Sequence, residues 1–167
     1  MKQLTPNELR EFAADIEMEL DRLKQLETDI QQVNGEIQRS SNLAKLLYEN
    51  LALKLHNFYT GCERVFRIIA SEPNGGEPSG YDWHKRLLER MSAEREGRVP
   101  VITAKTAQRL SEYLSFRHVV RNIYGFEPDL TRVAQLVKGY PSVWHGVQQD
   151  IQNFIRWLRQ LAQQLSD

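Results

Sequence analysis

Apolar residues recur every three or four positions along most of this chain, and that spacing constrains its fold more than any other feature. It predicts two long amphipathic helices at the start of the chain, the second broader in its apolar face than the first. The first stripe comprises Leu9, Phe12, Ile16, Leu20, Leu23, Leu26, Ile30, Val33 and Ile37, and the second Leu43, Leu47, Leu51, Leu55, Phe58, Cys62, Val65 and Ile69. No convincing run alternates between apolar and polar residues as a half-buried strand does. The sequence therefore predicts an all-α fold.

Capping and breaking residues set the expected boundaries in the first half of the chain. Thr5-Pro6-Asn7-Glu8 has the order of a capping box, with Thr as N-cap and Pro at the first helical position. Gly35 and Ser40-Ser41-Asn42 are expected to kink or end the first helix. Residues 71–80 read SEPNGGEPSG, which is rich in proline and glycine and predicts a flexible loop.

Similar signals divide the second half. Asp82 is expected to cap a helix that runs to about Glu96, and Thr103 to cap a helix that ends near Gly125. Asp129 is expected to cap a short helix from Leu130 to Val137. Gly139-Tyr140-Pro141 should then break the chain before a last amphipathic helix, whose apolar face comprises Val143, Trp144, Val147, Ile151, Phe154, Leu158, Leu161 and Leu165.

These elements predict one domain over residues 1–167. A chain of 167 residues can bury a substantial core without a disulfide or a metal. Neither flank of the 71–80 loop carries enough apolar stripes to close a core alone, so the loop is not a domain boundary. Short connections between successive helices favour an antiparallel bundle of about five to six helices.

The amino-acid composition limits which binding partners and which cellular compartment we expect for this protein. Lys plus Arg and Asp plus Glu both number 22, so the formal net charge is zero and any site for a polyanion must be local. Cys62 is the only cysteine, which excludes an intrachain disulfide and favours a reducing compartment. The N-terminal MKQLTPNELREF lacks the apolar core of a signal peptide, and every apolar run is shorter than a membrane span. We expect a cytoplasmic protein that is not embedded in a membrane.

One helix departs from the clean apolar pattern. Within the segment FRHVVRNIY at 116–124, helical geometry places Arg117, Arg121 and Tyr124 on the same face as the core-like leucines 110 and 114. His118 and Asn122 lie one turn apart, beside that face. Two guanidinium groups, an imidazole and an amide are thereby predicted to meet at one patch.

Such a patch has the chemistry to bind and cleave a phosphodiester. One guanidinium group can bind two phosphate oxygens at once and stays charged, while a histidine exchanges protons near neutral pH. His84, beside Trp83 on another predicted helix, is a second candidate if that helix packs across the patch. The competing interpretations are that the inward arginines only pair with carboxylates, and that His84 is a surface or capping residue.

The sequence offers no site for a bound cofactor. Phosphate-loop, dinucleotide-binding, nucleophile-elbow and EF-hand patterns are all absent. Four scattered histidines and one cysteine do not have zinc-ligand spacing, so we assign no metal and no cofactor.

The segment YLSFRHVVRNIYGFEPDLTRV, with YDWHKRLLERM upstream, resembles HepT-like proteins of the HEPN superfamily. The resemblance covers most of the chain. It implies a helical bundle that dimerises, with two motifs facing each other across a cleft, and acts as a metal-independent ribonuclease toxin. It also implies a partner, a minimal nucleotidyltransferase antitoxin that silences such toxins by adenylylating a tyrosine near the motif.

The family motif is an arginine, a polar residue and, after four to six intervening positions, a histidine. Arg121 and Asn122 match its first half, but 126–128 read Phe-Glu-Pro and no histidine follows before His145. Either His118 or His84 replaces the motif histidine, or the chain is a binding module without catalysis.

We therefore expect Arg121 and Arg117 to hold the scissile phosphate of RNA, Asn122 to orient it, and His118 or His84 to move the proton. Tyr124 is a further candidate for substrate contact. The alternatives are a catalytically inactive HEPN-like module that binds a nucleotidyltransferase or RNA, and a helical adaptor whose inward arginines are only salt-bridged.

Overall fold

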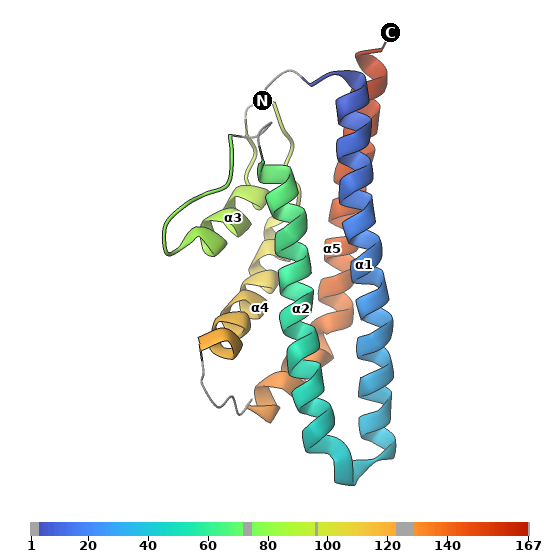
Figure 1. Ribbon diagram of the computed structural model, residues 1–167, viewed down its shortest axis with the longest axis vertical. Helices are drawn as coiled ribbons and strands as arrows, with labels where there is room; N and C mark the ends of the chain where they lie inside the picture. Colours follow the sequence, from blue (N-terminus) through green and yellow to red (C-terminus); the bar gives the residue numbers. More distant parts are fainter. Residues whose placement is uncertain (1–3, 72–74, 96, 123–128, 167) are drawn as a thin grey trace.

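The computed structural model describes residues 4–71, 75–95, 97–122 and 129–166, without the side chains of Val119, Arg121 and Asn122. The described residues form five α-helices and no strand, which confirms the all-helical prediction (Figure 1). The helices are α1 (Pro6–Arg39), α2 (Ala44–Ala70), α3 (Trp83–Ser92), α4 (Ala104–Asn122) and α5 (Leu130–Gln164), with a short 3₁₀ turn at Ser41–Leu43. None of these helices is long and apolar enough to cross a membrane.

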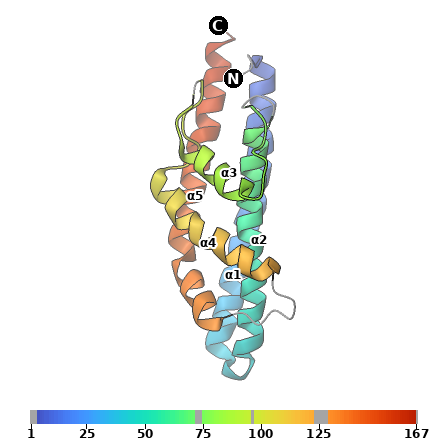
Figure 2. The same ribbon diagram turned by 90° about the vertical axis from the view of Figure 1, so that its left-hand side faces the viewer.

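The three long helices form the body of the bundle. α1 packs against α2 and α5, and α4 packs against α2 and α5 as well. α3 rests on α2 and α4, and the two shorter helices cross the long ones obliquely (Figure 2). α2 contacts all four other helices, so a residue on its inner face can reach both α3 and α4.

A group of aromatic side chains fills the centre of this bundle. Phe58 of α2 is fully buried and makes edge-to-face contacts with Tyr113 of α4 and with Tyr140 and Trp144 of α5, at ring-centroid distances of 5.4, 5.0 and 6.4 Å. Buried aromatic rings supply much apolar area per residue and prefer this geometry. The cluster joins α2, α4 and α5.

Three of the predicted caps are present. Thr5 Oγ1 accepts a hydrogen bond from Glu8 N while Glu8 Oε2 accepts one from Thr5 N, which completes the capping box. Asp129 Oδ1 accepts hydrogen bonds from the backbone at 131 and 132, and Thr103 Oγ1 accepts one from Thr106 N. Local polar residues therefore define where α1, α4 and α5 begin.

Some expected boundaries were wrong. Gly139-Tyr140-Pro141 does not break the chain, because α5 runs through it without interruption. Tyr140 is only 1% exposed, and Trp144 continues the same buried stripe. A proline inside a helix costs about 3 kcal/mol, and burial of this continuous apolar face offsets that cost.

Two other boundaries also differ from expectation. Gly35 does not interrupt α1, which ends at Arg39 beside the predicted serine cluster. α3 ends at Ser92 instead of near Glu96, because Met91 O accepts hydrogen bonds from the backbone N–H groups of Val101 and Ile102 as the chain folds back. Asp82 occupies the N-cap position of α3, but its side chain accepts no capping hydrogen bond.

Gly61 of α2 packs tightly against Leu23 of α1. A Cβ there would lie 2.6 Å from Leu23 Cδ2, whereas a Cβ at Gly35 would meet only Arg39 Nη2 at 3.4 Å. We expect Gly61→Val to lower the free energy of unfolding by about 1–3 kcal/mol through overpacking. The control, Gly35→Val, should change it by less than about 1 kcal/mol. Urea unfolding followed by circular dichroism measures both, and equal midpoints would contradict this packing.

Candidate functional site

Three charged or titratable side chains meet inside the bundle, each from a different helix. Glu63 comes from α2, His84 from α3 and Arg117 from α4, and the residues are only 4%, 6% and 7% exposed. Glu63 lies on the inner face of α2 between buried Tyr59 and Phe66, one turn away on either side. We call these three residues the buried network.

The Glu63 carboxylate is the centre of the buried network. His84 Nδ1 lies 2.5 Å from Glu63 Oε2, and Arg117 Nη1 lies 3.3 Å from Glu63 Oε1 and 3.4 Å from Oε2. Arg117 Nη1 is also 2.9 Å from His84 Nδ1. A guanidinium group only donates hydrogen bonds, so Arg117 Nη1 donates to Glu63, while the donor or acceptor role of His84 Nδ1 toward its two neighbours depends on the tautomer of the ring.

Stability alone does not explain such a network. Removing charges from water costs several kcal/mol per ion, and apolar residues of similar volume often stabilise a protein as much or more. The network is also incompletely satisfied, because Arg117 Nε is buried without a hydrogen-bond partner among the described atoms. Buried polar groups that cost stability are candidates for a positional or chemical role.

The buried network reaches the surface at His118. The imidazole rings of His84 and His118 lie edge to face, with their centroids 5.5 Å apart. His118 is exposed, whereas the neighbouring Arg117 is not. The Trp83 indole also stacks on the His84 ring, with the ring centroids 3.6 Å apart. The His84 ring is therefore fixed by contacts with Glu63, Trp83 and His118.

A groove between α3 and α4 ends at His118. Its volume is about 500 Å³. Leu88 and Leu114 contribute apolar walls, and Ser111 and Ser115 contribute hydroxyl groups. Both serines donate to backbone carbonyls of their own helix, so their oxygen lone pairs remain as acceptors. We refer to this hollow as the α3–α4 groove.

Burial keeps nearby nucleophiles protonated. It raises the pKa of the Tyr59 phenol well above its usual range, and the negative charge of Glu63 raises it further. Burial likewise raises the pKa of the Cys62 thiol. Neither group forms an anion near neutral pH, so the histidines remain the candidates for proton transfer.

The structure brings together three of the residues that the sequence indicated, namely Arg117, His84 and His118. Arg117 points inward as expected, but its Nη1 pairs with a carboxylate of its own chain. His84 is buried and paired, so its interpretation as a surface residue was wrong. The side chains of Arg121 and Asn122, and all of Tyr124, lie outside the described residues.

Sequence reasoning missed Glu63. The signal that could have found it is a carboxylate inside an apolar face: Glu63 directly follows the stripe residue Cys62, and the apolar Phe66 is one turn further on. An acidic residue in that position needs a cationic or donor partner. The inward arginine of α4 supplies it.

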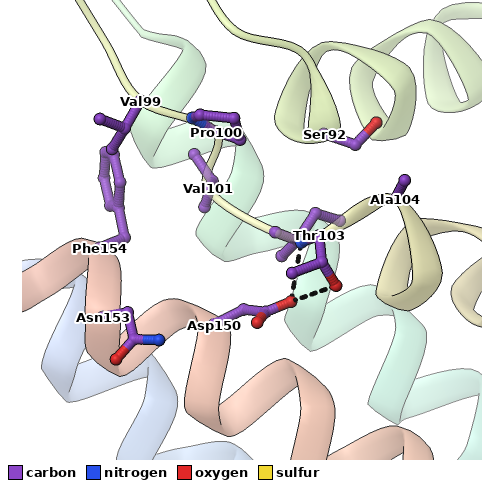
Figure 3. A pocket seen from close by; sticks show the side chains of 10 residues that line it. Ser92, Val99, Pro100, Val101, Thr103, Ala104, Asp150, Asn153 and Phe154 are labelled. Carbon is purple, nitrogen blue, oxygen red and sulfur yellow. Dashed lines mark hydrogen bonds between the residues drawn. The ribbon is translucent and has the colours of Figure 1, made fainter.

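A separate hollow of about 430 Å³ lies between α5 and the connector from α3 to α4 (Figure 3). Its walls are largely apolar, with Val99, Pro100 and Phe154 on one side (Figure 3). Asp150 accepts hydrogen bonds from both the backbone N and Oγ1 of Thr103, at 2.8 and 3.1 Å, and so holds the connector on α5. None of the predicted site residues lines this hollow.

Metal ligands are not grouped in the part of the chain that the structure describes. No three His, Cys, Asp or Glu side chains there are arranged so that they could hold an ion together.

A family model described as HepT-like protein matches residues 50–158. The matched range is more than half of the chain and includes the buried network, the α3–α4 groove and the segment FRHVVRNIY. No curated protein and no solved structure matches the chain.

Removing one member of the buried network should be costly, while removing all three should not be. Glu63→Ala leaves Arg117 buried without a counter-ion, and we expect a loss of about 3–5 kcal/mol in the free energy of unfolding. A triple apolar replacement, E63L/H84L/R117M, leaves no charged side chain at the position of the buried network and should recover most of that loss. Chemical denaturation measures both variants, and a triple variant no more stable than Glu63→Ala would contradict this view of the network.

Proposed function

Since the chain belongs to the HepT-like protein family, we propose that it is the toxin of a toxin–antitoxin pair and cleaves RNA, without a metal ion, as a homodimer. The observation that carries this proposal is the buried network placed directly against an exposed histidine. Glu63 fixes His84, and His84 contacts His118 at the end of the α3–α4 groove.

RNA supplies its own nucleophile. In metal-independent cleavage, the 2′-oxygen attacks the adjacent phosphorus and loses its proton, while the 5′-oxygen leaves and gains one. A cyclic 2′,3′-phosphate and a free 5′-hydroxyl result. The reaction therefore needs one proton acceptor, one proton donor and cations near the non-bridging oxygens.

We assign the proton acceptor to His118, because its ring is exposed while His84 is enclosed. His84 acts as a positioning residue through its edge-to-face contact, and Glu63 and Arg117 hold His84 in place. Arg121 and Asn122, on the next turn of α4, are assigned to the phosphate. His118 of the second subunit supplies the donor in this proposal, which makes dimerisation a requirement for turnover.

A catalytically inactive binding module is the second candidate. Two observations favour it: Arg117 is paired within its own chain, and no histidine occupies the family's motif position at 126–128. Such a module binds a nucleotidyltransferase-type antitoxin, or RNA, through the same face without turnover. Family membership supports an antitoxin partner under either proposal.

The nuclease proposal predicts RNA cleavage in the presence of EDTA, leaving cyclic phosphate ends. In the homodimer, His118→Ala removes both the proton acceptor and the proton donor, each worth about 10²–10⁴-fold in rate, so cleavage should slow by at least that factor. Arg121→Ala should also abolish cleavage without unfolding the protein. The rates are measured on a fluorescent RNA oligonucleotide under single-turnover conditions.

The matched control is His145→Ala, an exposed histidine of α5, which should cleave at the wild-type rate. Intact RNA with folded, dimeric wild-type protein would favour the binding module. Equal loss in His118→Ala and His145→Ala would contradict the assignment of His118.

A further inference from the structure

Four arginines gather along α3 and the turn that follows it. Arg86 and Arg90 lie one helical turn apart on α3, and the backbones of Arg95 and Arg98 form an antiparallel bridge just beyond its end. We call these four residues the arginine row. α3 also carries His84, so the row and the buried network share one short helix.

Backbone carbonyls hold three of the guanidinium groups. Arg86 Nη1 donates to Ser79 O and Arg90 Nη1 donates to Gly76 O, at 3.1 and 3.2 Å. Arg98 donates from Nη2 to Arg90 O at 2.9 Å and from Nη1 to Val99 O at 3.2 Å. A carbonyl orients a guanidinium group but does not neutralise its charge.

Carboxylates are interleaved with the arginine row, since Glu89 and Glu94 directly precede Arg90 and Arg95, but the ion pair of Glu89 is with Lys85. Asp82 lies 4.0 Å from Arg86, and Glu77 pairs with Arg67. No described carboxylate forms an ion pair with the other three arginines of the row.

Arg98 is the buried member of the row. It is only 4% exposed, and its buried Nε has no hydrogen-bond partner among the described atoms. Burial, and then the charge of Arg95, lower the pKa of Arg98. Burial and the charges of Arg95 and Arg86 lower the pKa of Arg90 in the same way. The row is a local concentration of positive charge that an anion would relieve.

We propose that Arg86, Arg90 and Arg95, the members of the arginine row that reach solvent, bind successive phosphates of single-stranded RNA next to the cleavage site. This inference rests on the proposed function and adds where the flanking strand docks. Arg86 and Arg90 stand about 6 Å apart along the helix axis, and the row continues past the end of α3. An extended row of cations suits a polymer with repeated charges better than a single free phosphate.

The charge of the whole chain makes such a local site necessary. Lys plus Arg equals Asp plus Glu, so no overall field attracts RNA. Affinity for RNA depends largely on phosphates that Lys and Arg neutralise, and it falls as salt rises. A chain with no net charge needs a local group of solvent-facing cations that its own carboxylates do not pair with in order to bind RNA.

The test uses a fluorescein-labelled 2′-O-methyl oligouridine, which has no free 2′-hydroxyl and so cannot be cleaved. Anisotropy gives its Kd for the full chain over a sodium chloride titration. The test variant is R90Q/R95Q, since both residues are at least partly exposed. The control is R39Q/K45Q, which removes the same charge where α1 meets α2, at the end of the bundle opposite the chain termini (Figure 1).

We expect R90Q/R95Q to weaken binding on the order of tenfold, and to reduce the log–log salt slope by about 0.7 for each RNA phosphate that the variant no longer neutralises. R39Q/K45Q should match the wild type. R90K/R95K should restore most of the affinity and the slope, because it keeps the charge while changing the hydrogen bonds to the loop. Thermal unfolding confirms that each variant is folded.

Equal Kd values and slopes for R90Q/R95Q and wild type would overturn the proposal, as would equal losses of affinity in R90Q/R95Q and R39Q/K45Q. No binding by the wild type would also overturn it and would leave the row to an acidic protein partner. If R90Q/R95Q weakens RNA binding but the wild type does not cleave ordinary RNA, the RNA-binding role of the arginine row is supported and the nuclease activity is contradicted. If the wild type cleaves ordinary RNA but R90Q/R95Q binds RNA as well as the wild type does, the nuclease activity is supported and the RNA-binding role of the row is contradicted.

Discussion

The arrangement of α2, α3 and α4 depends on two contacts of the Glu63 carboxyl group, one with His84 and one with Arg117. This carboxyl group forms a hydrogen bond with His84 Nδ1 and an ion pair with Arg117, so one side chain joins three helices at a point that is almost closed to solvent. α3 is only 10 residues long, too short to be stable alone, and its orientation comes from such tertiary contacts. The position of His84, and through it that of His118, therefore follows from a residue on a different helix.

This constraint links the fold to the proposed chemistry. A histidine that exchanges protons needs a defined orientation, and a neighbouring ring that is itself held in place can supply it. Here the carboxylate fixes His84, which in turn contacts the exposed His118. Arg117 Nη1 lies 3.3 Å from Glu63 Oε1 and so brings a positive charge to the buried carboxyl group. The proposed function assigns Arg117 to holding the site together and leaves the phosphate to Arg121.

The sequence predicted the helices well because apolar spacing and capping residues act locally. Thr5, Thr103 and Asp129 cap helices where expected, and Arg117 is buried as its position beside Leu110 and Leu114 indicated. The sequence did not predict that α5 continues through Tyr140-Pro141, where burial across the bundle outweighs a local helix break. It also did not predict the end of α3, because long-range hydrogen bonds to Met91 O determine it. The role of Glu63 was not predicted because its partners lie on other helices, and no local sequence pattern indicates which residues they are.

The central claim is that the buried network positions His118 for cleavage of RNA. The most direct test is to measure RNA cleavage by the apolar replacement E63L/H84L/R117M. We expect a folded variant whose EDTA-resistant cleavage is lost or reduced by orders of magnitude, because His118 is still present but nothing holds it in position. A folded variant that cleaves RNA at the wild-type rate would contradict the claim, since the network would then be structural only. A wild-type protein without activity would contradict it as well.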